Sequence, residues 1–308
     1  MGTGASRQEF SGKRVIYWEP GTALTDTRNT LYCIRINTGN DPYSSWAEKF
    51  DAFLQTPGVA DISGLVVGNG SHDDEGACYY RAIVTLVAAR QHLSGLTTLR
   101  FGDGDIRQAE EEPFWIEPGT LSSLLAAYPA LDMLCISGTN GIRAGLLSHE
   151  RLRTLIIESS GLDARIVHEV QHAHLPALEH LELWTGLKDW GCTTTLADLA
   201  PLLSARIFPH LRSLGLRACS FADDVACMLA QSPLLAQLHR LDLSLGTLGD
   251  RGAEALLRSP MIHTLKELDI HHHFCSQELV TRLQRAGMSV DSSEPQPADK
   301  ARFIGLYV

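Results

Sequence analysis

The sequence predicts an α/β solenoid, in which stacked strand–helix units place parallel strands on an inner, concave side and helices on an outer, convex side. Three observations predict it. An apolar motif recurs along the chain, segments with helical apolar spacing lie between its copies, and the 308 residues exceed the usual size of one compact core. One strand and one helix cannot bury their own apolar faces, whereas stacked units share a continuous core.

The motif consists of apolar residues spaced as apolar-x-x-apolar-x-apolar. Its clearest copies are Leu152-Leu155-Ile157, Leu178-Leu181-Leu183, Leu211-Leu214-Leu216, Leu238-Leu241-Leu243 and Leu265-Leu268-Ile270. Two further copies carry substitutions, Leu96-Leu99-Phe101 and Leu131-Leu134-Ile136, and two are weaker, Leu31-Ile34-Ile36 and Ile62-Leu65-Val67. Two consecutive steps are 27 residues long (238 − 211 and 265 − 238). The alternation at the end of the motif puts both apolar residues on one face of a strand.

Segments between the strands carry apolar residues at steps of three and four, which predicts helices. These segments are residues 82–90, 121–128, 164–172, 224–230, 251–258 and 277–285. Strands and helices therefore alternate along the chain.

The stretch Leu238–Leu256, with its turn Leu248-Gly249-Asp250-Arg251-Gly252-Ala253, resembles leucine-rich repeat proteins of the ribonuclease-inhibitor-like class. The stretches Leu178–Trp184, Leu243–Leu248 and Leu268–His273 are also similar to a family of uncharacterised bacterial cytoplasmic leucine-rich repeat proteins. The resemblance covers about residues 10–290. It implies a leucine-rich repeat solenoid (horseshoe) and a cytoplasmic location, and it carries no reaction, substrate or catalytic residue.

The repeat pattern divides the chain into three regions. Residues 1–60 form a leader and capping unit with irregular motif copies, residues 61–290 form the repeat array, and residues 291–308 form a linker and a short apolar tail. The linker contains Glu294-Pro295-Gln296-Pro297, and such proline-containing polar stretches are typical of loops.

Composition excludes several classes of function. The formal charge of −10 argues against nucleic-acid binding, which needs a basic surface, and no apolar run approaches the length of a membrane span. The seven widely spaced cysteines indicate free thiols in a reducing compartment. Only Cys219 matches the Asn or Cys that usually stands ninth in this kind of motif, and it is expected to be a buried structural residue. No cofactor motif occurs.

The third, fifth and seventh residues of each motif should project from the inner face. Neighbouring strands lie about 4.8 Å apart, so Asp242 should lie beside Asp269, with Glu182 two strands from Asp242 across Gly215. The candidate binding residues on this face are Glu158, His180, Glu182, Trp184, Arg217, Arg240, Asp242, Ser244, Glu267, Asp269 and His271.

Three interpretations of this face remain open. The first is a non-catalytic protein-binding surface, with Trp184 as the anchor and the carboxylates selecting a partner with a basic surface. The second is a metal site formed by Asp242, Asp269 and His271, in a metal-binding accessory component of an enzyme system. The third is a solvated face without a ligand. Ser244, Asp269 and His271 include the residue types of a nucleophilic set, but no catalytic motif surrounds them, so no enzyme is predicted.

Overall fold

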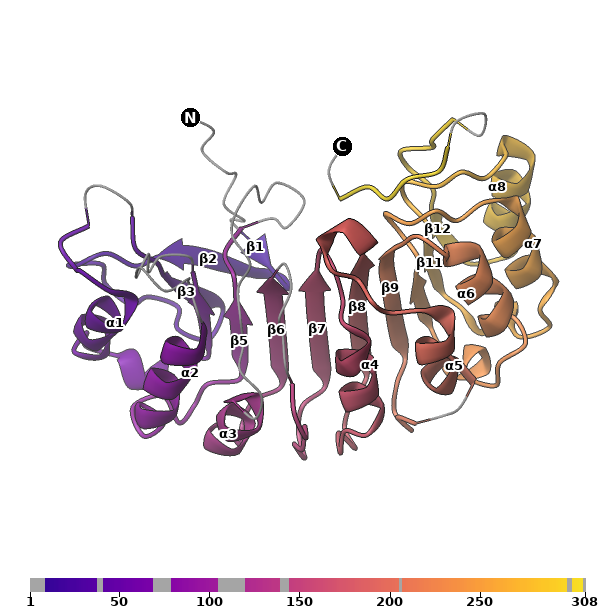
Figure 1. Cartoon of the computed structure of the whole chain (residues 1–308). Coiled ribbons are helices and arrows are strands. Elements are labelled where there is room, and N and C mark those ends of the chain that lie inside the picture. The colour runs from indigo at the N-terminus through magenta and orange to yellow at the C-terminus, as the bar shows by residue number, and fades with distance from the viewer. Residues whose placement is uncertain are drawn as a thin grey trace. The chain divides into compact units, whose positions relative to one another are not determined.

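The computed structural model describes residues 9–37, 41–68, 79–104, 120–138, 144–204, 207–297 and 301–306. The chain forms two compact units, the first made of residues 1–154 and 172–175 and the second of residues 155–171 and 176–308. In both units, strands alternate with helices (Figure 1). The predicted region boundaries at residues 60 and 290 do not coincide with this division into two units, and they stay predictions.

The strands of the first unit are ordered as in the sequence. They are β1 (Glu9–Phe10), β2 (Lys13–Tyr17), β3 (Thr30–Ile34), β4 (Gly64–Val67), β5 (Thr98–Phe101) and β6 (Met133–Gly138). Its helices are α1 (Trp46–Leu54), α2 (Tyr79–Ala88) and α3 (Thr120–Ala127). β1 and β2 are antiparallel, and from β2 to β6 each strand pairs in parallel with the next. An antiparallel hairpin thus precedes the parallel strands.

The second unit continues the same alternation. Its strands are β7 (Thr154–Ser159), β8 (His180–Gly186), β9 (Ser213–Cys219), β10 (Arg240–Asp242), β11 (Glu267–Asp269) and β12 (Ser289–Asp291). Its helices are α4 (Ala164–Gln171), α5 (Leu196–Ser204), α6 (Ala222–Leu229), α7 (Asp250–Arg258) and α8 (Gln277–Gln284), and each packs on the next. No helix in the described residues is both long and apolar enough to cross a membrane.

Corresponding motif residues pair across the strands, which confirms an α/β leucine-rich repeat solenoid. Leu214 pairs with Leu181 on one side and with Leu241 on the other, and Leu241 pairs with Leu268. All four side chains are buried. Burial of one leucine side chain contributes about 1.5–3 kcal/mol to the stability of the fold. Each repeat adds a similar contribution.

The first motif copy has a different register from the predicted one. The pattern Leu31-Ile34-Ile36 would place Ile34 fourth, but Tyr32 pairs with Leu65, the fourth residue of the next copy. The register is therefore shifted by two residues. The aromatic side chain fits this apolar position because its ring packs near Phe53 while its hydroxyl donates to the Thr25 carbonyl at 2.7 Å.

All six predicted helices are present, and within the described residues two further α-helices, α1 and α5, were not predicted. α1 begins after Ser45, whose hydroxyl accepts from the Glu48 amide at 3.2 Å, a helix-capping arrangement. α5 contains Pro201, a residue that usually argues against a helix interior.

The chain leaves several strands of the second unit through the same backbone conformation. The eighth motif residues Ala218, Leu245, His272 and Glu294 have φ angles of 49°, 60°, 58° and 56°. Left-handed backbone is uncommon outside glycine, so its recurrence marks the point where each repeat turns away from the sheet. The next residue in the first of these copies, Cys219, is fully buried, as predicted.

Candidate functional site

The inner face of the second unit consists of the third, fifth and seventh motif residues, on the side of the sheet opposite the buried leucines. Its lateral order agrees with the prediction. Asp242 pairs with Asp269, and Gly215 lies between Asp242 and Glu182. β12 adds Asp291 beside Asp269. Four carboxylates therefore occupy the fifth position, on β8, β10, β11 and β12.

The fifth and seventh residues of these repeats are joined by hydrogen bonds. Oδ1 of Asp242 accepts from the Ser244 amide at 3.0 Å and from its hydroxyl at 2.6 Å. Asp291 and Ser293 repeat this pair of bonds at 3.0 and 2.7 Å. Each carboxylate thus holds the turn that follows its own strand.

On β11 the same arrangement uses a histidine in place of serine. Oδ1 of Asp269 accepts from the His271 amide at 3.0 Å and lies 2.7 Å from the His271 Nδ1. Burial opposes ionisation of Asp269, but the hydrogen bonds and charge of His271 outweigh it and lower the pKa of that carboxyl. The Ser244 hydroxyl is hydrogen-bonded to Asp242 and Arg217. Ser244, Asp269 and His271 therefore do not form one hydrogen-bonded chain of nucleophile, base and carboxylate.

Trp184 is not an exposed anchor, which corrects the predicted role of this residue. Its side chain is 1% exposed. The guanidinium of Arg217, on the paired strand, lies 4.4 Å above the ring, and the indole Nε1 donates to Oε1 of Glu182 at 2.6 Å. A cation over an indole face and a hydrogen-bonded indole nitrogen both stabilise a buried tryptophan. Trp184 is thus a buried residue that stabilises the strands beneath the inner face.

Arg217 connects the buried carboxylates of neighbouring repeats. It lies 3.4 Å from Oε1 of Glu182 and 3.7 Å from Oδ1 of Asp242, and it donates to Ser244 at 2.9 Å. Burial would raise the pKa of Glu182, but hydrogen bonds from His180 and Trp184 and the charge of Arg217 lower it to about 2. At Asp242 burial prevails over Arg217 and raises the pKa.

The candidate residues divide into a buried and an accessible group. Glu158, Glu182, Trp184, Asp242 and Ser244 are buried. His180, Arg217, Arg240, Glu267, Asp269 and His271 are at least partly exposed, and Asp291 is exposed. The side chains of Arg240 and Glu267 are 44% and 62% exposed. A macromolecule can contact the second group without unfolding the repeats.

Arg240 is the more exposed of the two arginines in the accessible group, with its side chain 44% exposed against 18% for Arg217. It lies 3.5 Å from Asp242, 3.9 Å from Glu267 and 4.0 Å from Asp269. The described strands β11 and β12 carry three accessible carboxylates, those of Glu267, Asp269 and Asp291, and no Lys or Arg, so this end of the face is acidic.

The metal hypothesis named Asp242, Asp269 and His271, and the structure changes that set. Asp269, His271 and Asp291 each offer one ligand atom, and these atoms lie within 4.8 Å of one another. Asp242 is bonded to Ser244 and lies outside this group. The guanidinium of Arg240, 4.0 Å from Asp269, disfavours a second cation there. Proximity alone supports this group, so a metal function is not favoured.

Asp291 is the inner-face residue that sequence analysis missed, because residues 291–300 were assigned to a linker. A signal was present. The sequence Asp291-Ser292-Ser293 repeats the Asp-x-Ser order of Asp242-Leu243-Ser244. The hydrophobic motif is weak in this copy, where Val290 takes the fourth position opposite Leu268.

The first unit contains a buried cation that no sequence motif indicated. Lys49 of α1 is fully buried, and its Nζ lies 3.0 Å from Oε1 of Glu19 and 2.7 Å from Oδ2 of Asp41. Burial opposes ionisation of Asp41, but hydrogen bonds from Lys49 and two backbone amides lower its pKa. These bonds hold the segment around Asp41 to α1, a structural role.

Comparison with known proteins supports the fold. No family model matches the chain, and no curated protein matches it significantly. A Bacteroides fragilis protein of known crystal structure superposes with a TM-score of 0.74 and 27% identity, over 85% of this chain and 73% of that one. An internalin from Listeria monocytogenes gives a TM-score of 0.30 and 12% identity, over 78% and 71% of the two chains. A TM-score of 0.30 is too low to indicate a shared fold. The similarity to the Bacteroides protein concerns the fold alone and identifies no partner or reaction.

Proposed function

We propose that this chain is a non-catalytic protein-interaction module that binds a partner through the accessible part of the inner face of the second unit. The observation that carries the proposal is the acidic group of Glu267, Asp269 and Asp291 on two paired strands. Repeat proteins commonly bind through such extended sheet surfaces. An acidic surface favours a partner that presents Lys or Arg side chains.

The buried group supports this surface from below. Arg217, whose side chain is 18% exposed, lies within ion-pair distance of Glu182 and Asp242 and covers Trp184, so we count it with this support and not with the contact residues. Accessible carboxylates on a rigid base bind with little loss of conformational freedom. The proposed contact residues are therefore His180, Arg240, Glu267, Asp269, His271 and Asp291.

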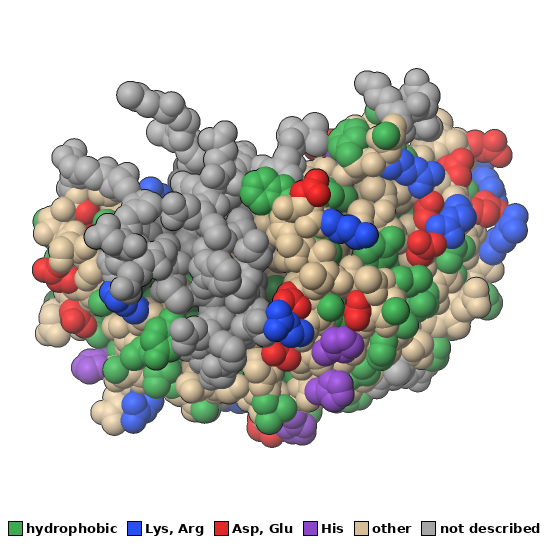
Figure 2. All heavy atoms as spheres, viewed as in Figure 1, with side chains coloured by type: hydrophobic (Ala, Val, Ile, Leu, Met, Phe, Trp, Pro, Cys, Tyr) green, Lys and Arg blue, Asp and Glu red, His purple; other side chains and the backbone are tan. Residues whose placement is uncertain are grey.

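The outer helices of the second unit carry a different charge pattern. Over α6 to α8, acidic and basic side chains lie interspersed (Figure 2). Arg251 pairs with Asp224, and Arg258 and Arg282 both pair with Glu254. Such mutually neutralised surface pairs attract a charged partner weakly. This contrast favours the inner face as the binding surface.

The test is affinity capture from the native cell with the full chain as bait. The variant Glu267→Lys with Asp291→Lys reverses two accessible inner-face charges. The control variant Asp51→Lys with Glu278→Lys makes the same change of charge at exposed positions on helices α1 and α8. Circular dichroism and thermal unfolding establish that all three proteins are folded.

We expect a partner with a basic surface that the wild type and the control variant retain and the inner-face variant loses. Its retention should fall as salt is raised from about 0.05 to 0.5 M, because exposed charges are screened. Equal capture by all three proteins would show that the partner binds elsewhere. The cytoplasmic location and the ribonuclease-inhibitor-like class remain predictions beside this proposal.

A further inference from the structure

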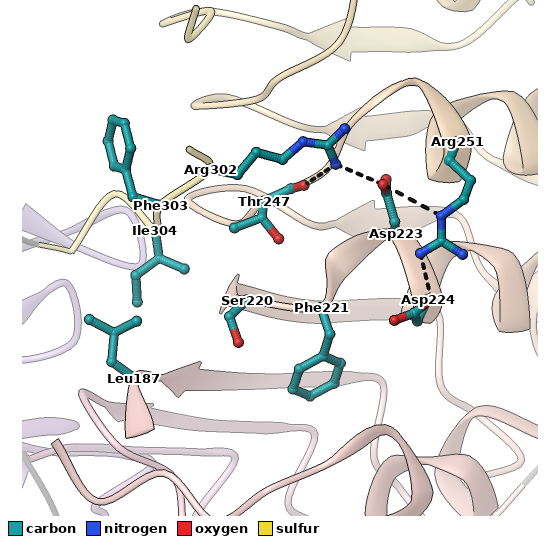
Figure 3. A pocket seen from close by; sticks show the side chains of 10 residues that line it. All are labelled: Leu187, Ser220, Phe221, Asp223, Asp224, Thr247, Arg251, Arg302, Phe303 and Ile304. Atoms are coloured by element: carbon teal, nitrogen blue, oxygen red, sulfur yellow. Dashed lines mark hydrogen bonds and ion pairs between the residues drawn. The ribbon is translucent and has the colours of Figure 1, made fainter. Parts of the chain in front are cut away.

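Residues 301–306, here called the tail segment, lie against the turns that follow the strands of the second unit. Nη1 of Arg302 donates to Oδ2 of Asp223 at 2.7 Å and to the Thr247 carbonyl at 3.1 Å (Figure 3). The Gly305 amide donates to the Leu245 carbonyl at 2.8 Å. The segment is anchored at both ends, yet no strand or helix is assigned within it.

The tail segment also buries two apolar side chains. Ile304 and Leu306 are buried, although both belong to a segment without regular structure. The ring of Phe303 lies edge-on to His272 and Phe274, with centroid distances of 5.2 and 5.6 Å. A basic side chain, an aromatic ring and two aliphatic side chains thus make the contacts.

The surface under this segment is here called the tail groove, formed by Asp223, Leu245, Thr247, His272 and Phe274. Leu245 and His272 are the eighth residues of consecutive repeats and share the left-handed backbone described above. The groove is therefore built from equivalent positions of the repeat. The carboxylate of Asp223 lies at the end where Arg302 binds, and Leu245, Thr247, His272 and Phe274 line the remainder.

The groove admits only a small residue at the position of Gly305. A Cβ atom there would lie 2.9 Å from Cδ2 of His272 and 3.1 Å from Cδ2 of Leu245. Both neighbours are buried, so neither side chain can move aside easily. The groove therefore discriminates between sequences at this position, as a peptide-binding site does.

The tail segment does not satisfy every group of the groove. His272 is 3% exposed, and within the described residues neither ring nitrogen has a hydrogen-bond partner. Burial lowers the pKa of this imidazole, although the backbone groups of His272 and Gly246 and the charge of Glu294 act in the opposite direction. A different occupant could supply a hydrogen bond that the tail segment does not.

There is also unfilled space beside the tail segment. An open pocket of about 280 Å³ is bounded by Arg302, Phe303 and Ile304 on one side and by residues including Leu187, Phe221 and Arg251 on the other (Figure 3). The tail segment therefore leaves part of this surface uncovered.

We propose that the tail groove is a binding site for an extended peptide with a basic, aromatic, aliphatic and glycine residue in that order. The chain's own tail segment occupies it as an intramolecular ligand. Its order Arg302-Phe303-Ile304-Gly305 defines the ligand class, and a partner segment of this class displaces it. This site is separate from the inner-face function and does not depend on it.

The test separates the tail segment from the folded chain without truncating the gene. A protease recognition sequence is inserted between Pro297 and Ala301 of the full chain, which is folded first and cleaved afterwards. Native mass spectrometry then follows release of the peptide that begins at Ala301. Fluorescence anisotropy measures rebinding of a labelled synthetic peptide of residues 301–308.

We expect the cleaved chain to remain folded, to release the peptide on dilution and to bind the labelled peptide saturably. Peptides with Arg302→Glu or Gly305→Val should bind at least ten-fold more weakly. A peptide with Ala301→Ser, a change at an exposed residue, should bind as the unmodified peptide does. These changes leave the folded chain untouched, so a loss of binding reports on the groove.

Three outcomes would overturn the proposal. The labelled peptide fails to bind the released chain, all four peptides bind equally, or the chain unfolds as the tail segment leaves. The last result would make the segment part of the core.

Discussion

At the scale of single residues, carboxylates of the inner face support the fold, and some of them also belong to the proposed binding surface. Glu182, Asp242, Asp269 and Asp291 each bond to the seventh residue of their own repeat. The first two are also buried beside Arg217. Mutation of Glu182 or Asp242 should therefore affect the stability of the fold more than partner binding. A binding test is better directed at Glu267 and Asp291.

Glu182 should make stability depend on pH. Its pKa of about 2 in the folded chain lies below the ordinary 4.5. A lowered carboxyl pKa stabilises the fold above 4.5, and this contribution is lost as the pH falls from 4.5 towards 2. The difference corresponds to roughly 3 kcal/mol.

We therefore expect Glu182→Gln to lower the free energy of unfolding by about 2–3 kcal/mol at pH 6 and by under about 1 kcal/mol near pH 2.5. Urea unfolding of both proteins across this range measures the difference. A pH-independent difference would show that Glu182 acts through packing and not through its charge.

The positions of the inner-face residues could be predicted from the sequence, because alternation along a strand and the repeat step determine them. The burial of Trp184 could not, because it depends on Arg217, a residue of the next repeat. The pattern gives the face on which a side chain lies but not the neighbours that cover it.

At the scale of elements, one side chain joins two repeats at the start of α7. Oδ1 of Asp223, in α6, accepts from the amides of Gly249 and Gly252 at 2.8 and 3.0 Å. A Cβ atom on Gly252 would lie 2.7 Å from this oxygen. The glycines of the Leu-Gly-Asp-x-Gly-Ala turn thus allow a carboxylate of the preceding repeat to cap the helix.

Asp223→Ala should lower the free energy of unfolding by about 2–4 kcal/mol, because two buried amides lose their acceptor and Arg302 loses its carboxylate partner. Asp224→Ala, the matched change at the next residue, removes a surface ion pair and should cost under about 1 kcal/mol. Guanidinium unfolding of both variants measures the contrast. Equal losses would contradict the capping role of Asp223.

The failure to predict some elements correctly has physical causes. α5 was not predicted because it contains Pro201, and proline removes a backbone hydrogen-bond donor and so argues against a helix interior. The nine-residue helix forms nevertheless. The first motif copy was placed two residues off because Tyr32, an aromatic residue, stands where leucine was expected. Strands with full leucine motifs, such as β8 and β9, contained no such substitution.

At the scale of the whole molecule, each repeat packs mainly on its neighbours, so the effect of a core mutation should stay local. Leu241→Ala removes a fully buried side chain of β10 and should destabilise the fold by about 2–5 kcal/mol. Hydrogen exchange should show lost protection in β9, β10 and β11, with α1 little changed.

The matched substitution Leu99→Ala, at the equivalent position of β5, should give the converse pattern. Protection that falls evenly along the chain in either variant would instead indicate one cooperative unit.

The final strand has a consequence for association between molecules. A strand at the edge of a sheet can template pairing with another chain, and natural proteins prevent this with short, charged and proline-containing edges. β12 has three residues, carries Asp291, and is followed by Pro295 and Pro297, which have no amide hydrogen to donate. A parallel sheet of this kind would otherwise present a hydrogen-bonding ribbon on which further copies could stack. The polar sequence after Val290, which weakens the repeat motif, is thus of the kind that disfavours fibre-like polymerisation.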